Sequence, residues 1–249
     1  MWQIIHKWGS PKWFYTTTGP WLRWLWASAL LLIGIGSVWG LAFAPPDRYQ
    51  HDSERILYVH VPAAILAQSC FAAMAVCAVV FLVWKIKVAD IAAMVMAPFG
   101  ATMTFAALFS GSVWGIPTWG TWWVWDARLT SMLIQLFIYL GVIGLRASFV
   151  SRDSGAKAAA IMTLVGVINL PIIKYSVVWW NTLHQPATFS IDKAPAMPAA
   201  MWLPLLFTVL GFYLFFVAIT IDRTRTHLLK RDARARWVKE VAGINGGGQ

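Results

Sequence analysis

Six long apolar stretches are the feature that most constrains this chain. A helix that spans a bilayer needs about 20 consecutive apolar residues, and inside hydrocarbon it must satisfy its own backbone hydrogen bonds. The chain has 249 residues, of which 59% are hydrophobic and only 12% charged, so it is not a soluble domain. We predict an all-α integral membrane protein, 1–249, with one domain of six transmembrane helices. The predicted spans are 21–43, 57–84, 92–113, 127–147, 157–178 and 201–221.

The distribution of lysine and arginine predicts the orientation of these spans. Fifteen of the 20 basic side chains fall on one side of the membrane, which the positive-inside rule identifies as cytoplasmic. Both termini, including a basic tail at 222–249, are therefore expected in the cytoplasm. The net charge of +10 then reflects topology, so no nucleic-acid partner is expected. The tail either contacts membrane lipid or a partner, or is simply solvated.

A tryptophan-rich segment, 113–127, lies between the third and fourth spans and is expected to face outward. Two interpretations are open: an aromatic platform for a large flat ligand, or a densely packed interfacial loop. The spacing after Pro117 favours a short amphipathic helix with Trp119, Trp122, Trp123 and Asp126 on one face. The candidate platform comprises Trp114, Trp119, Trp122, Trp123 and Trp125.

Two histidines flank this segment at the same expected depth. His60 and His184 each lie about one turn above the apolar layer, on the outward side. Either could be a polar residue tolerated among lipid headgroups. Beside an aromatic platform, two neutral imidazoles also suit the two faces of a haem iron. His51, in a polar loop, is expected to be solvated.

The other residues available favour haem over a zinc or copper ion. A mononuclear site would need further cysteine, histidine or carboxylate ligands, and aromatic rings contribute nothing to it. Haem needs cations for its propionates, for which Arg128 and Arg55 are the nearest candidates and Lys174 the third. Arg128 could instead form a local pair with Asp126. The chain has no C-x-x-C-H motif and no phosphate-binding loop. We therefore expect non-covalent haem b and no nucleotide hydrolysis.

The motif Trp114-Gly-Ile-Pro-Thr-Trp-Gly-Thr-Trp-Trp-Val-Trp-Asp126 resembles the tryptophan-rich "WWD" motif of haem-handling proteins. With six spans and two flanking histidines, essentially the whole chain is similar to the CcmC family of bacterial cytochrome c maturation. The resemblance implies a bacterial inner-membrane protein whose platform is periplasmic. It implies that His60 and His184 ligate haem while the platform presents the haem edge to the chaperone CcmE, which becomes covalently linked to it. The further partners implied are the ATPase CcmA, the membrane subunit CcmB and the small single-span CcmD.

Two functions from different classes remain open on the sequence. One is a haem-binding delivery subunit, which is not an enzyme in the ordinary sense. The other is a transporter that moves haem or another apolar solute through its own helix bundle. An absorption spectrum would distinguish haem from no haem, and a vesicle assay would distinguish delivery from transport. The sequence leaves open how haem arrives, from which leaflet, in which oxidation state and in what stoichiometry.

Overall fold

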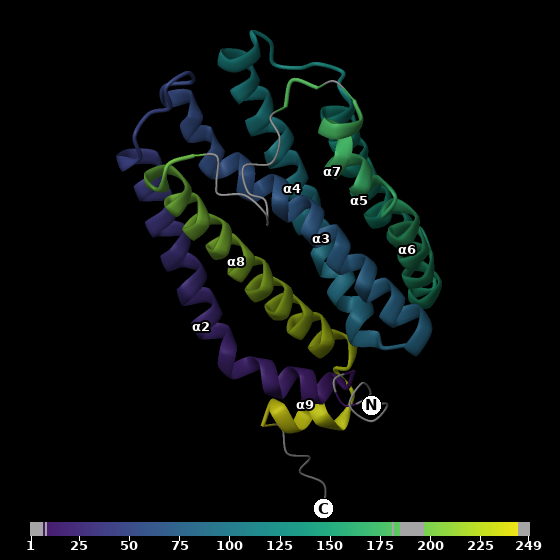
Figure 1. The fold of residues 1–249 in the computed structure, drawn as a ribbon. Helices are drawn as coiled ribbons and strands as arrows, with labels where there is room; N and C mark the ends of the chain where they lie inside the picture. Colours follow the sequence, from purple (N-terminus) through teal and green to yellow (C-terminus); the bar gives the residue numbers. More distant parts are fainter. Residues whose placement is uncertain (1–6, 8, 181, 185–196, 244–249) are drawn as a thin grey trace, which may run out of the picture.

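The computed structural model describes residues 7, 9–180, 182–184 and 197–243, and these residues form a helical bundle (Figure 1). No strand occurs among them, apart from one isolated bridge between Asp47 and His51. The predicted all-α architecture with six candidate spans is confirmed. The spans long and apolar enough to cross a membrane are Pro11–Phe43, Asp52–Trp84, Lys87–Trp119, Ala127–Ala147, Arg152–Trp179 and Ala199–Arg231.

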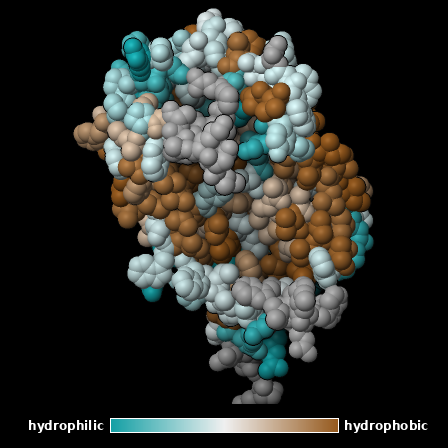
Figure 2. Space-filling view, in the orientation of Figure 1, coloured by the Kyte–Doolittle hydropathy of each residue, from teal (hydrophilic) through white to brown (hydrophobic). Residues whose placement is uncertain are grey.

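The surface of the bundle matches a bilayer environment. Figure 2 shows apolar residues gathered around the middle of the molecule and hydrophilic residues toward both ends. Many large apolar side chains in the spans are exposed, among them Leu31, Phe105 and Phe137. Exposed apolar surface on this scale marks contact with lipid or with protein partners. The chain is therefore a multi-pass membrane protein.

Two pairs of long helices pack extensively against each other and organise the bundle. α3 (Leu57–Trp84) and α4 (Lys87–Trp119) form a hairpin through a tight turn, in which Lys85 adopts a left-handed conformation (φ 56°). α2 (Pro11–Val38) packs mainly along α8 (Ala199–Arg231). Gly36 makes this second contact close, since a Cβ there would lie 2.4 Å from the Thr208 hydroxyl. Small residues permit such close approach between helices in membranes.

Several spans differ in extent from the prediction. The first begins ten residues earlier, at Pro11, and ends in a π-helical turn, Trp39–Phe43. The third continues to Trp119, and the sixth to Arg231. The fifth is two helices, α6 (Arg152–Gly166) and α7 (Asn169–Trp179), after a break at Val167 and Ile168. Asn169 Nδ2 donates at this break to Ser131 O at 2.9 Å and to Gln135 Oε1 at 3.1 Å, which anchors α7 on α5 (Ala127–Ala147).

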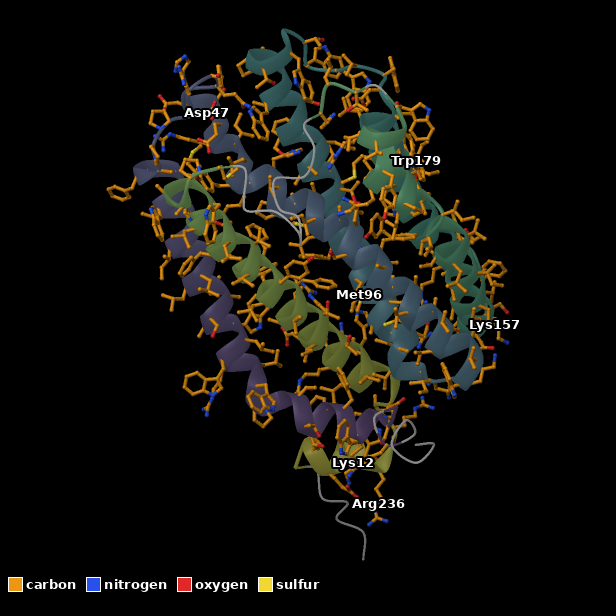
Figure 3. The ribbon with its side chains drawn as sticks, in the orientation of Figure 1. Lys12, Asp47, Met96, Lys157, Trp179 and Arg236 are labelled. Carbon is orange, nitrogen blue, oxygen red and sulfur yellow. The ribbon has the colours of Figure 1, made fainter. Side chains whose placement is uncertain are left out.

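The described ends of the chain lie together, opposite the tryptophan-rich segment (Figure 1). Figure 3 shows Lys12 and Arg236 at one end of the bundle and Asp47 at the other. The short helix α9 (Arg236–Val241) packs across the start of α2, where Lys12 Nζ lies 2.7 Å from Glu240 Oε2. Part of the predicted basic tail is thus folded onto the bundle. Residues 244–249 of that tail lie outside the described residues.

Candidate haem-binding site

The tryptophan-rich segment does not form the predicted amphipathic helix. Residues 113–119 are the last turns of α4, and 121–126 are non-helical. Gly120 ends α4 with φ 75°, the left-handed conformation that commonly closes helices. Asp126 is the N-cap of α5, since its Oδ1 accepts from the Leu129 N–H at 2.7 Å. A helix end and a helix start so close together leave no room for a third helix between them.

The structure sorts the five tryptophans into three environments. Trp114 is partly buried and packs against Leu57 and Tyr58. Trp119 and Trp123 are partly buried and pack on another apolar cluster, which contains Leu129 and Ile173. Trp122 and Trp125 remain exposed, at 64% and 76% of their surface. The five rings therefore do not form one flat face: three belong to the bundle and two project from it.

His60 on α3 is positioned by the end of α4. Its ring meets that of Trp114 edge to face, with centroids 5.7 Å apart. Its Nδ1 lies 3.1 Å from Ser110 Oγ. The close approach requires Gly111, because a Cβ there would lie 2.9 Å from His60 Cε1. His60 is thus packed on one face of the last turns of α4.

His184 meets the same end of α4 from another direction. Its ring lies edge to face with that of Trp119, at a centroid distance of 4.7 Å. Its Nδ1 lies 3.2 Å from Asp126 Oδ2, and the two side chains are only 16% and 8% exposed. Burial lowers the pKa of His184 below its usual value of 6.5, although Asp126 opposes the shift. The imidazole is therefore neutral at neutral pH, the form that ligates a metal.

The two histidines, 124 residues apart in sequence, both contact the last turns of α4. A charge on either imidazole would act on the other, and the charge of Arg128 acts on both. Asp126 pairs with His184, and no ion pair joins Asp126 to Arg128 within the part of the chain that the structure describes. The local Arg128 pair considered from the sequence is therefore not formed.

Two other predicted residues lie elsewhere. Arg55 Nη1 donates to Gly40 O at 3.2 Å and to Leu41 O at 2.8 Å, and its Nε lies 3.0 Å from Asp52 Oδ1. Its guanidinium thus secures the end of the first span. His51 is exposed, as expected of a solvated loop residue.

Imidazole and indole rings dominate the side chains at the end of α4. Across 7, 9–180, 182–184 and 197–243, no three His, Cys, Asp or Glu side chains gather to hold a metal. Two imidazoles lie among indole rings, and a cation acts on both. A haem site uses groups of these kinds, namely axial nitrogens, an aromatic surface and a cation for the propionates.

Three supporting residues were not found from the sequence. Gln50 Oε1 accepts the indole N–H of Trp114 at 2.8 Å, and Ser110 and Gly111 hold His60. The sequence does contain a signal that places Ser110 and Gly111 near His60, because α3 and α4 form a hairpin. His60 and Ser110 lie at equal distances along the chain from the turn at Lys85, so antiparallel spans must bring them to one level. No comparable signal links Gln50 to Trp114.

Comparison with known proteins places this chain in a family. The family described as CcmC, heme exporter protein C, matches residues 4–239. The chain is 47% identical to heme exporter protein C of Haemophilus influenzae over 242 residues, covering 97% of this chain and 98% of that protein. It is 46% identical to the protein of the same name from Escherichia coli K12 over 241 residues, or 97% of each. With that of Bradyrhizobium diazoefficiens the identity is 42% over 233 residues, or 94% and 88%. The chain therefore belongs to the heme exporter protein C family.

Proposed function

We propose that this chain binds haem b non-covalently between His60 and His184 and delivers it to the chaperone CcmE for c-type cytochrome maturation. One observation carries the proposal: each imidazole packs on its own tryptophan at the end of α4, while its Nδ1 faces a polar partner. That arrangement leaves both Nε2 atoms for an iron. The relatives' name, heme exporter protein C, supports haem as the cargo.

The remaining residues have separate roles in this proposal. Trp114 and Trp119 wall the haem next to its axial ligands, and Trp123 fixes the segment to the bundle. Trp122 and Trp125, which are exposed, present the haem edge to CcmE. Arg128 is the first candidate for a propionate, because its charge acts on both histidines. Arg55 is the weaker candidate, because its guanidinium already donates to two backbone carbonyls and pairs with Asp52.

In this proposal the chain is a binding and delivery subunit of a CcmABCD-type complex, and it promotes covalent attachment of haem to CcmE without being an enzyme in the ordinary sense. The sequence has no phosphate-binding loop, so ATP hydrolysis falls to CcmA. CcmB and CcmD supply further membrane helices. Large exposed apolar side chains on α2, such as Trp21 and Leu31, leave room for lipid or for such neighbours.

We further propose that the site faces the periplasm and that the chain lies in the inner membrane of a bacterium. The support is the concentration of basic residues at the end of the bundle that carries α9 and the start of α2. A reporter that works only in the cytoplasm should be active when it is fused after Gln249, and one that works only in the periplasm should be inactive there. Periplasmic activity of the same fusion would contradict the proposed orientation.

The ligand assignment is tested by spectroscopy of the purified protein. The wild-type protein should carry six-coordinate, low-spin haem. His60→Ala and His184→Ala should each give a five-coordinate or weak-field spectrum, and small imidazole should restore the low-spin form by filling the vacant position. His51→Ala is the matched control and should change nothing. An unchanged spectrum in both site variants, with loss in the control, would refute the assignment.

Delivery and transport are separated by a second assay. Vesicles that contain this chain alone should not move haem between the inside and the outside, whereas the chain with CcmE should load the chaperone. Haem movement in the vesicles without partners would favour the alternative, a transporter that uses its own bundle.

A further inference from the structure

The Nδ1 atoms of the two histidines face partners of different charge. His184 Nδ1 lies 3.2 Å from the Oδ2 of Asp126, whose other oxygen caps α5. This carboxylate is held in place by the helix start and is nearly buried, with 8% of the side chain exposed. Because a carboxylate only accepts hydrogen bonds, His184 must be protonated at Nδ1, which leaves the lone pair on Nε2.

His60 faces a neutral hydroxyl instead. Its Nδ1 lies 3.1 Å from Ser110 Oγ. The Ser110 hydroxyl donates to Ala106 O at 2.6 Å, and a hydroxyl has only one hydrogen to donate. The Ser110 oxygen therefore accepts from His60, which fixes the same tautomer as in His184. Both rings thus offer Nε2, but only one is backed by an anion.

A hydrogen bond from a ligating imidazole to a carboxylate raises the basicity of the ligand. A hydroxyl that already donates to a carbonyl polarises the ring far less. We propose that Asp126 and Ser110 are positioning residues of the haem site, and that their difference makes His184 the tightly held axial ligand and His60 the exchangeable one. This inference rests on the proposed bis-histidine site, because it assigns an order to the two ligands.

The difference in strength between the two axial ligands affects how haem would leave the site. A haem that leaves the site must lose both axial bonds, and the weaker one breaks first. Release of His60 would free one coordination position for a ligand of the acceptor, while His184, backed by Asp126, would still hold the haem.

Three single variants test the inference on haem-loaded protein. Asp126→Asn keeps a side chain that can cap α5 but removes the charge. It should retain the low-spin spectrum and raise the reduction potential, since a less basic ligand stabilises ferric iron less. Ser110→Ala should leave the potential close to wild type and accelerate carbon monoxide binding to ferrous haem several-fold, because that reaction waits for His60 to leave. Ser112→Ala, on the same helix end, is the matched control and should alter neither quantity.

The carbon monoxide complex identifies which histidine remains. If His60 leaves, the complex of Ser110→Ala should match that of wild type in its Fe–C stretching frequency, whereas that of Asp126→Asn should differ. The opposite pattern, or no response in either variant, would overturn the inference. A wild-type protein without low-spin haem would instead refute the proposed function, so the two failures are distinguishable.

Discussion

The indole N–H of Trp114 donates to Oε1 of Gln50 at 2.8 Å, and this bond ties the loop between the first two spans to the end of α4. Gln50 is itself fixed by the turn around Asp47, whose Oδ1 accepts its backbone N–H at 2.8 Å. Two segments 64 residues apart thus hold the ring on which His60 packs. The relationship predicts that a loop residue outside the tryptophan motif controls the haem site.

Gln50→Ala should weaken haem binding about fivefold, because a typical intramolecular hydrogen bond contributes about 1 kcal/mol and Trp114 would lose its orientation. Titration of the haem-free protein with haem measures the change in Kd. Tyr49→Ala is the matched control, since Tyr49 lies in the same turn and is 83% exposed. Equal losses in both variants would show that the turn matters only as a whole.

Trp123→Ala and Trp125→Ala should differ in stability despite their proximity, with ring centroids 5.3 Å apart. Trp123 packs against Leu129 and Ile173, so its removal should cost about 2 to 3 kcal/mol, less than for a fully buried ring. Trp125 is mostly exposed, and its loss should change stability by less than about 0.5 kcal/mol. Thermal unfolding in detergent gives both values. If Trp125→Ala kept its stability but also loaded CcmE normally, the proposed contact with the chaperone would be wrong.

Gly111→Ala should impair haem ligation without unfolding the protein. The added methyl would lie 2.9 Å from His60 Cε1, so the ring must move away from Ser110. We expect a reduced low-spin fraction and at least a severalfold weaker Kd for haem. Gly144→Ala is the control, because a methyl there meets no neighbouring atom within 4 Å. A full low-spin signal in Gly111→Ala would mean that the position of His60 is not critical.

The protonation of His184 offers a test in the haem-free protein. Burial lowers the pKa of His184, so it should titrate below 6.5 in an NMR titration of labelled histidine. In the window between its native pKa and 6.5 the unfolded chain binds more protons, so this residue lowers stability as the pH falls. Asp126→Asn should move the midpoint lower still, because the carboxylate opposes the effect of burial. A midpoint above 6.5 would show that the pair with Asp126 outweighs burial.

Much of the fold follows from local properties of the sequence. The length of the apolar stretches predicts six spanning helices, because a backbone inside the bilayer must make its hydrogen bonds within the helix. The helix α5, for example, runs from Ala127 to Ala147. The break at Val167 and Ile168 was not predicted. Gly166 precedes the break, and Pro171, four residues after Val167, has no N–H to donate to the Val167 carbonyl. The packing of Asn169 on α5 stabilises the break. The helix predicted over 119–126 was wrong, because side-chain periodicity does not reveal that Gly120 ends one helix and that Asp126, six residues later, caps the next.

For the site, the sequence by itself determined which residue types were present and how far along the apolar spans each of them lies. Distance from the apolar layer is a one-dimensional property, and it was enough to place His60 and His184 at the same end of the bundle. Only the tertiary structure decided their partners, because Ser110, Gly111 and Asp126 meet the two rings from other helices. It also decided which tryptophans are packed and which are exposed, since burial depends on the neighbouring helices and not on spacing within the segment.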